Sequence, residues 1–424
     1  MLWGGQSVSR LGSQVSLLAL PLLAIATLHA TTLQVGLLSA SETVPFLLVG
    51  LPAGVVVDHL AKRRVMIAGD AGRALVLASI PVAWAAGALT MAQLFVVALV
   101  SGVLTVFFDV AYQSYLPDLI TAPQLVDGNG KLATTESLAQ VAGPAAAGAL
   151  VQVVGAALAV LVDAVSFAVS AFALLGIRVE DRRPPAPEVG GASRPRLLLS
   201  EIGEGLRFVF RERHLRSITA CTATANLFGG MTAAIIVLYL YRSLHLGPAV
   251  IGTAFAIGSV GAVGASLVAG RLGVLIGIGP AILWSAAIGN CGDLLLPLAP
   301  QVHPLPFIVA GLFVAGAGTV AYNVSQVSLR QTLCPLQLLG RMNASIRFLV
   351  WGTLPVGGVL GGILGTTLGL HAALWVGCAG GATAFLWIAC SPVPGLRTTA
   401  ETGARLQLGE VAGPVEVEGP EPTA

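Results

Sequence analysis

The stretch Gly54-Val-Val-Val-Asp-His-Leu-Ala-Lys-Arg-Arg64 places a short, strongly basic loop between two long apolar segments. The segment before it spans Leu33–Val57, and the segment after it spans Val65–Gly87. A helix needs about 20 mostly apolar residues to cross a bilayer, and both segments exceed that length. The loop therefore marks a membrane surface, where one spanning helix ends and the next begins.

The composition of the whole chain excludes a water-soluble globular protein. Only 42 of the 424 residues are charged at neutral pH, from 22 Lys and Arg plus 20 Asp and Glu. Apolar residues make up 55% of the chain, and the mean hydropathy is +0.87. A soluble protein carries roughly 25% charged residues because its surface must be hydrated. Most of the outer surface of this chain must therefore face lipid.

Twelve apolar segments, six on each side of a long polar stretch, predict an all-α membrane protein with twelve transmembrane helices in two six-helix halves. They are Leu2–Leu28, Leu33–Val57, Val65–Gly87, Ala92–Leu116, Leu132–Val154, Ala156–Ile177, Leu215–Leu240, Ala249–Ala269, Gly279–Leu298, Pro304–Leu329, Met342–Leu368 and Ala372–Cys390. The first begins almost at Met1 without a basic region before it, so it is not a signal peptide. We expect that a cytoplasmic leader is missing from the start of this sequence.

The predicted organisation has four parts. The N-terminal half covers residues 1–177, a cytoplasmic linker 178–214, the C-terminal half 215–390, and a disordered cytoplasmic tail 391–424. The second half of the linker spaces apolar residues as in a helix, with charged residues opposite, which predicts an amphipathic helix on the membrane surface. An ordinary solvated linker helix is the alternative. The apolar residues are Leu198, Ile202, Leu206 and Val209.

Basic residues are distributed unevenly between the two sets of alternate loops. Only Arg242 falls in one set. Cytoplasmic loops are enriched in Lys and Arg, so the other set is the cytoplasmic one. We predict that both termini and the linker lie in the cytoplasm, in a multi-pass protein of the plasma membrane. The cytoplasmic set, besides the linker arginines, is Lys62, Arg63, Arg64, Lys131, Arg271, Arg330, Arg341, Arg397 and Arg405.

The basic loop resembles the signature of the major facilitator superfamily, which has a glycine, an acid four residues later and then a basic cluster. His59 and Ala61 depart from it, because the signature usually has a basic residue and a second glycine there. Two six-helix halves joined by a cytoplasmic linker are also the architecture of this superfamily. The resemblance implies a secondary transporter that works by alternating access. The matching residues are Gly54, Asp58, Lys62, Arg63 and Arg64.

A second stretch, Ala139–Gly148, resembles the helix-5 motif of exporters in this superfamily, with alanines replacing glycines at 139 and 147. Pro144 frees a backbone carbonyl and bends the helix, whereas Gly143 and Gly148 let a neighbouring helix approach closely. The stretches at 108–119 and 339–344 are similar to the enterobactin-exporter and macrolide-efflux branch. This similarity implies export of a small molecule.

Asp58 ends a predicted span at the cytoplasmic face. There it can pair with the N-terminus of a neighbouring helix, where the backbone dipole favours an anion. The expected partner is the helix that starts near Arg341–Asn343. A contact made in only one access state acts as a conformational latch, because it biases the equilibrium between the states. The alternative is that the basic residues only hold this loop inside the cell.

Polar residues inside the predicted spans are candidates for function, because a bilayer makes them costly. Glu42, Asp109 and Glu136 are the candidates for proton coupling. Asp70 and Arg73 lie one turn apart and are expected to form a structural ion pair. Asp163 and Asp293 are further acids inside the spans. The candidates for lining the cavity and contacting substrate are Gln6, Arg10, Gln14, Tyr112, Gln113, Asn226, Asn323, Gln326 and Arg347.

Two of these groups have a predicted geometry. Gln6, Arg10 and Gln14 recur every four residues and form a stripe that should line the central cavity. Arg10, Asp70, Arg73 and Asp109 lie at a similar depth, so we expect one charged cluster near the cytoplasmic side.

We therefore predict a secondary transporter, most simply a proton-coupled exporter of a small amphipathic molecule such as a drug, siderophore or natural product. An importer, or a non-transporting receptor or scaffold on the same fold, is the alternative. The chain has no H-E-x-x-H, nucleophile elbow, paired metal-ligand spacing or complete phosphate-binding loop, so we expect no enzyme, cofactor or metal. The expected partners are the substrate, protons and the lipid bilayer, without nucleic acid, and the expected state is a monomer.

Overall fold

The computed structural model describes residues 2–58, 60–119, 122–176, 203–204, 206–334 and 338–397, and the regular structure in these ranges is helical. The N-terminal half comprises α1 (Leu2–Ala26), α2 (Thr32–Leu48), α3 (Gly50–Asp58), α4 (Lys62–Ala85), α5 (Met91–Leu119), α6 (Ala122–Val154) and α7 (Ala156–Leu175). The C-terminal half comprises α9 (Arg213–Leu238), η1 (Tyr239–Ser243), α10 (Pro248–Leu275), α11 (Ile278–Gly292), η2 (Asp293–Leu295), α12 (Leu305–Leu333), α13 (Leu339–Trp351), α14 (Thr353–Thr367), α15 (Leu370–Ala382), η3 (Thr383–Phe385), α16 (Leu386–Ala389) and η4 (Val393–Gly395).

The helices confirm an all-α membrane protein. Ten helical stretches among the described residues are long and apolar enough to cross a membrane. Two further stretches, α2 with α3 and α11 with η2, occupy the places of the predicted second and ninth spans. The elements therefore follow the order of two halves with six spans each. Each span runs from one end of the molecule to the other.

Two of the predicted spans are broken near a proline. The span predicted over 33–57 divides at Val49, and the span predicted over 342–368 divides at Gly352. Pro52 and Pro355 each follow three residues after these breaks. A proline has no N–H to bond the carbonyl four residues earlier, and its ring crowds that carbonyl. The loss of this bond favours a break at both places, although Pro45 and Pro144 lie inside the unbroken helices α2 and α6.

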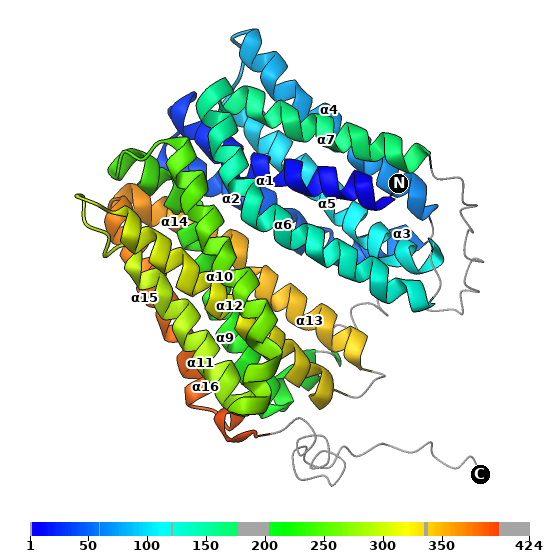
Figure 1. Ribbon diagram of the computed structural model, residues 1–424, viewed down its shortest axis with the longest axis vertical. Coiled ribbons are helices and arrows are strands. Elements are labelled where there is room, and N and C mark those ends of the chain that lie inside the picture. Colours follow the sequence, from blue (N-terminus) through cyan, green and yellow to red (C-terminus); the bar gives the residue numbers. More distant parts are fainter. Residues whose placement is uncertain are drawn as a thin grey trace.

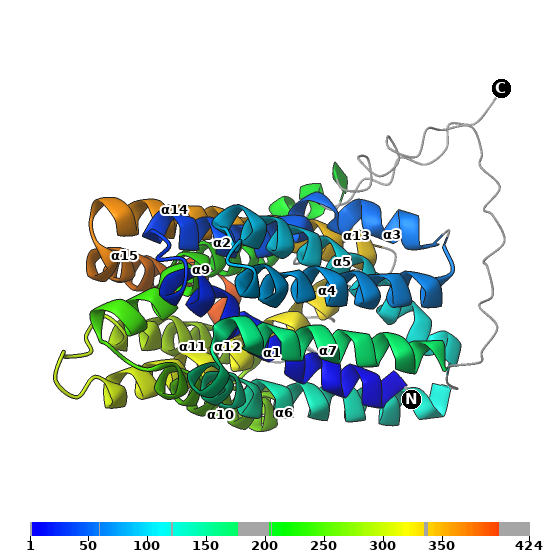
Figure 2. The ribbon, with the colours of Figure 1, turned by 90° about the horizontal axis from the view of Figure 1, so that it is seen from above.

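Two pairs of helices make most of the contact between the two halves. Helix α2 packs against α14, and α6 packs against α10, and Figure 2 shows these pairs on opposite sides of the molecule. Sharp turns occur at matching places in the two halves, between α6 and α7 at Gly155 and between α14 and α15 at Gly369. Their φ angles of 84° and 88° suit glycine, which has no Cβ to clash in this region.

The halves are packed together at one end and separate at the other. One buried apolar cluster combines residues of both halves, around Leu22 and Leu238. At the end where α7 finishes and α9 begins, the buried clusters instead belong to one half each, around Phe108 and around Ile218. Figure 1 shows the halves diverging toward this end, next to α3 and α13. We call it the linker end and the opposite one the closed end.

The linker and the tail lie largely outside the described residues, which exclude 177–202, 205 and 398–424. Residues 206–211 are helical, and their apolar face is turned toward the protein, because Val209 is fully buried in the cluster that contains Leu215. Glu204 forms an ion pair with Arg341 at the start of α13. The described part of the predicted amphipathic helix therefore packs on the C-terminal half.

Candidate transport cavity

A cavity of about 430 Å³ lies between the two halves. Helices α1, α2 and α6 line it from the N-terminal half, and α9, α10, η2 and α12 from the C-terminal half. Its walls are mainly leucine, isoleucine, valine, alanine and phenylalanine side chains. A volume of this size with apolar walls is typical of sites for drug-sized molecules. The polar residues that line it are Gln14, Ser39, Glu42, Thr232, Ser259 and Asp293.

Two carboxylates enter this apolar cavity from opposite halves. Glu42 is on α2, and Asp293 begins the short helix η2 that follows α11. None of the described residues that line the cavity is a lysine, arginine or histidine. The two acids therefore carry the ionisable charge of this site, and they favour a positively charged or hydrogen-bond-donating ligand.

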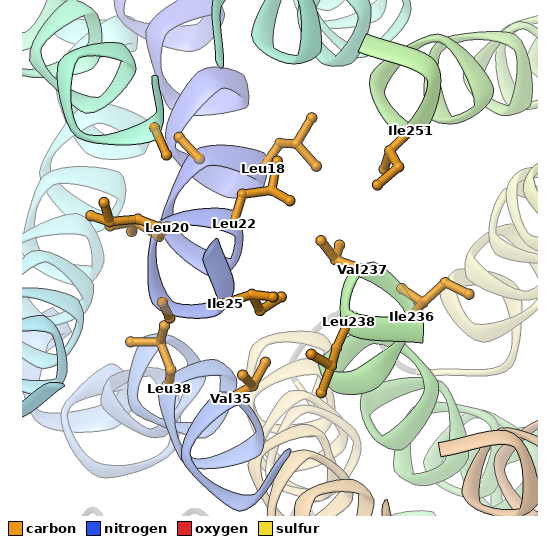
Figure 3. Close-up of a cluster of buried hydrophobic side chains, with 14 of the residues drawn as sticks. Leu18, Leu20, Leu22, Ile25, Val35, Leu38, Ile236, Val237, Leu238 and Ile251 are labelled. Carbon is orange, nitrogen blue, oxygen red and sulfur yellow. The ribbon is translucent and has the colours of Figure 1, made fainter. Parts of the chain in front are cut away.

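Large aliphatic side chains seal the cavity at the closed end. Figure 3 shows Leu22 and Ile25 of α1 pointing toward Val237 and Leu238 of α9, and each of the four is at most 8% exposed. Next to this seal, the guanidinium of Arg242 donates a hydrogen bond of 2.9 Å to the carbonyl of Ala30. These side chains close the space between α1 and α9 at this end.

Glycines allow the backbones of the two halves to meet on both sides of the cavity. A Cβ built on Gly36 of α2 would lie 2.6 Å from the carbonyl oxygen of Gly358 and 2.7 Å from the Cα of Gly362, both on α14. A Cβ on Gly252 of α10 would overlap the carbonyl oxygen of Pro144 on α6. Only glycine fits such contacts between helices.

The predicted helix-5 motif lies on α6 at this interface. Pro144 lines the cavity. Gly148 faces the start of α10 around Pro248, across the boundary between the halves, whereas Gly143 faces Gln14 of α1 within the N-terminal half. The motif thus places α6 against both neighbours at once.

The structure brings Arg10 together with two of the predicted proton-coupling residues. Its guanidinium lies 3.8 Å from Asp109 on α5 and 3.3 Å from Glu136 on α6. All three side chains are partly exposed, toward the linker end. Tyr112, one turn beyond Asp109, stacks on Phe108, and Gln113 is exposed.

The stripe of Gln6, Arg10 and Gln14 divides between three environments. Gln14 lines the cavity. Gln6 differs from the expectation, because it is buried against α7, where its amide donates a hydrogen bond of 3.2 Å to Ser170. Helical spacing gives the face of α1 on which a residue lies, but the adjacent helix decides whether that face is covered.

Asp70 and Arg73 form the expected ion pair, with an N–O distance of 2.5 Å and both side chains buried. The guanidinium of Arg73 also lies between the rings of Phe108 and Phe167, at 4.5 and 4.0 Å from their centroids. A cation held between two aromatic faces is strongly fixed in place. The pair lies deeper than Arg10 and its partners, so the expected single cluster is two neighbouring groups.

The candidates of the C-terminal half gather in a separate pocket of about 510 Å³, which Asn226, Asn323, Gln326 and Arg347 all line. Arg330 joins its walls through hydrogen bonds to Gln326 at 3.3 Å and to Asn343 at 2.7 Å. Arg347 lies over the ring of Trp351, at 4.8 Å, and that ring contacts Phe46 of α2 at 5.2 Å. These residues line the space toward the linker end.

The structure describes the surroundings of some residues of the predicted latch. Gly54 lies in α3, and Lys62 begins α4. Arg63 donates hydrogen bonds of 2.9 and 2.8 Å to the carbonyls of Leu174 and Leu175 at the end of α7, where a cation complements the helix dipole. Arg64 is exposed. Asp58 is the last residue of α3, but its side chain and all of His59 lie outside the described residues.

Comparison with known proteins agrees with this architecture. A family model described as transmembrane secretion effector matches residues 1–418. The chain belongs to this family of major facilitator transporters. The resemblance in the basic loop is thereby confirmed, and the protein is a multi-pass membrane transporter of small molecules rather than an enzyme.

Relatives of this transporter include a named pump. Multidrug efflux pump Tap of Mycobacterium tuberculosis is 29% identical over 370 residues, which cover 85% of each chain. The MFS-type transporter YfiS of Bacillus subtilis is 25% identical over 405 residues, covering 92% of this chain and 89% of YfiS.

Two solved structures share the fold. A bacterial homologue of the iron transporter ferroportin, in an inward-facing state, aligns with a TM-score of 0.71 at 17% identity, over 92% of this chain and 97% of that one. The nucleoside transporter NupG aligns with a TM-score of 0.68 at 14% identity, over 92% of this chain and 97% of NupG. At such identities the likeness establishes the fold alone.

Proposed function

We propose that this transporter is a proton-driven exporter of small amphipathic molecules such as drugs, siderophores or other natural products. The observation that carries the proposal is the central cavity, which both halves line with apolar side chains and one acid each. An apolar wall accepts the hydrophobic part of such a molecule, and the carboxylates accept its polar or cationic part. The similarity to a multidrug efflux pump supports the same direction of transport.

The state described fits the step of an alternating-access cycle in which the halves are apart at the linker end and together at the closed end. The cavity is sealed at the closed end, and the halves separate at the linker end. The distribution of basic residues supports a cytoplasmic location for the linker end and both termini. In that orientation the cavity loads from the cytoplasm and, after the halves rock, releases to the outside. One chain completes the cavity, which supports a monomer as the working unit.

Proton coupling requires an ionisable group that changes its surroundings during the cycle. Among the three predicted carriers, Glu42 lines the cavity itself, whereas Asp109 and Glu136 both lie beside Arg10. Glu42 is therefore the first candidate, and Asp109 is the second. Asp58 and the basic cluster would bias the two access states, and Gly143, Pro144 and Gly148 would hold α6 at the interface about which the halves move.

The test is efflux of a panel of dyes and antibiotics from cells that express the protein, with and without an uncoupler. Export against a gradient that collapses with the uncoupler supports the proposal. Accumulation inside the cells overturns the direction, and efflux that ignores the uncoupler overturns proton coupling. Vector-only cells provide the background.

A further inference from the structure

A second chamber, of about 180 Å³, lies inside the N-terminal half beside the transport cavity. Its walls come from α1, α2, α4, α5 and α7, all in the N-terminal half. Glu42 lines both this chamber and the transport cavity, so it forms part of the wall between them. A group that reaches Glu42 from the chamber therefore does not have to pass the substrate.

Polar side chains make up a larger share of the lining residues of this chamber than of the transport cavity. Half of its fourteen lining residues carry a hydroxyl group or a charge. The hydroxyl of Ser101 and the Nε of Arg73 are buried, and within the described part of the chain neither atom has a hydrogen-bond partner. Such atoms are normally satisfied by ordered water. A water molecule needs about 10–15 Å³ of cavity volume, so the chamber has room for several water molecules.

Asp163 of α7 is the second acid in the chamber and is 2% exposed. Its carboxylate accepts a hydrogen bond of 3.2 Å from Ser166 on the same helix. The groups that face it from other helices are Ser16 of α1 and, on α4, Arg73 and Asp70. Arg73 is already paired with Asp70 at 2.5 Å. One cation therefore lies near the two carboxylates of Asp70 and Asp163. Asp163 is thus a buried acid without a cation of its own, which suits a group that binds and releases a proton.

We propose that this chamber is a proton-exchange site separate from the substrate site, in which Asp163 and Glu42 exchange a proton through water held between them. This inference rests on the proposed function. When Glu42 releases its proton, a water accepts it and another water passes a proton to the carboxylate of Asp163, so the number of protons is unchanged. Substrate occupies the cavity side of Glu42, and the proton arrives on the chamber side. Both can then act on one carboxylate at different stages of the cycle.

The decisive experiment uses the full-length protein in liposomes that enclose a pH-sensitive dye, with ethidium as the transported probe. Two variants alter the chamber in different ways. Asp163→Asn removes the titratable group but keeps the shape of the side chain, and Ser101→Val fills the chamber without changing charge. Both variants should lower ethidium-coupled proton counterflow, Asp163→Asn by about 100-fold, the scale on which removal of a proton-transfer group acts. Ethidium exchange at equilibrium should change by less than about twofold, because that reaction needs no net proton movement.

The control is Ser266→Val, which makes the same substitution on the exposed face of α10, away from the chamber. It should pump as the wild type does. If both chamber variants also pump like the wild type, the chamber is not the proton route, and the proposed function stands. If Asp163→Asn loses exchange as well while Ser101→Val is normal, Asp163 is structural and the inference is wrong. If the wild type shows no proton counterflow, the proposed function fails and the inference fails with it.

Discussion

Glu42 of α2 and Asp293 of η2 line one cavity from opposite halves of the chain. Under the proposed alternating access the halves would move relative to each other, and the distance between these two carboxylates would change during the cycle. Each acid otherwise has mainly apolar neighbours in the cavity wall. The free energy of a bound cation therefore depends on how closely the two halves approach, which gives the cavity a means of binding in one state and releasing in the other.

Glu42→Gln should abolish efflux against a gradient but preserve movement down a gradient, with weaker binding of a cation, because it removes the link to the proton and one of the two carboxylates in the cavity. Ethidium efflux from energised and de-energised cells measures both. Ser39→Ala, on the same helix and in the same cavity, is the matched control. Uncoupler-sensitive pumping by Glu42→Gln would assign the carrier elsewhere, first to Asp109 and then to Glu136.

Asp293→Asn should weaken binding of a cationic dye by about 10-fold, since about 1.4 kcal/mol of attraction is a modest value for a charge near a partly buried acid. Binding of an uncharged substrate should be unaffected. Fluorescence titration of the purified protein compares the two ligands. Asp293→Glu, which keeps the charge, should bind the cation nearly as the wild type does. Equal weakening for both ligands would indicate a change of shape instead.

Gly252→Ala should destabilise the protein and impair transport, because the added methyl group overlaps the carbonyl of Pro144 across the interface. Overpacking of this kind costs about 1–3 kcal/mol. Gly264→Ala, on the same helix with nothing near its Cβ, should be neutral or stabilise by up to about 1 kcal/mol. Thermal unfolding in detergent and transport rates separate the two variants. Similar behaviour of both would contradict close packing at Gly252.

Asp58→Asn should slow transport while leaving membrane insertion and thermal stability unchanged. As a latch, the acid would be needed in one access state only, so its loss should shift the balance by about 1–3 kcal/mol, the usual scale of such couplings. Initial rates at matched expression are the measurement. A normal rate would leave the basic cluster with a topological role alone.

A cysteine placed at Ala192 in the linker should react with an impermeant maleimide in inverted vesicles and not in intact cells. Ser243→Cys, at the closed end, should show the reverse pattern. Labelling of Ala192→Cys from outside intact cells would overturn the predicted orientation. The background for both variants lacks the native cysteines, which are Cys221, Cys291, Cys334, Cys378 and Cys390.

Hydropathy and loop charge alone predict the class of fold and the order of the spans. They do not predict that α2 and α3 are separate helices, since an apolar run looks continuous across Val49. Pro52 favours a break there, because a proline interior to a helix removes one backbone bond, but Pro45 lies in the same run without breaking α2. The same reading applied to Pro355 locates the break between α13 and α14.

The site was harder to predict than the fold. Glu42 and Gln14 are in the cavity as expected, and Arg10 is beside Asp109. Gln6 shares their helical face but is covered by α7, and helix neighbours are not encoded in the spacing of one helix. Asp293 also lines the cavity, although it is not among the predicted cavity or proton-coupling residues. Its signal is a single acid in an otherwise apolar segment, which marks a functional position in a membrane helix.

Backbone contact between the halves, at α2 with α14 and at α6 with α10, leaves no room for a lipid tail to slip between them near the closed end. A compound dissolved in the leaflet on that side would then not enter the cavity between either pair of helices. It must first flip to the leaflet at the linker end or enter the water there. For a compound that starts in the leaflet at the closed end, the rate of extrusion should then be limited by the rate at which it crosses the bilayer unaided. Such a compound would be exported slowly if it permeates slowly, even when it binds the cavity tightly.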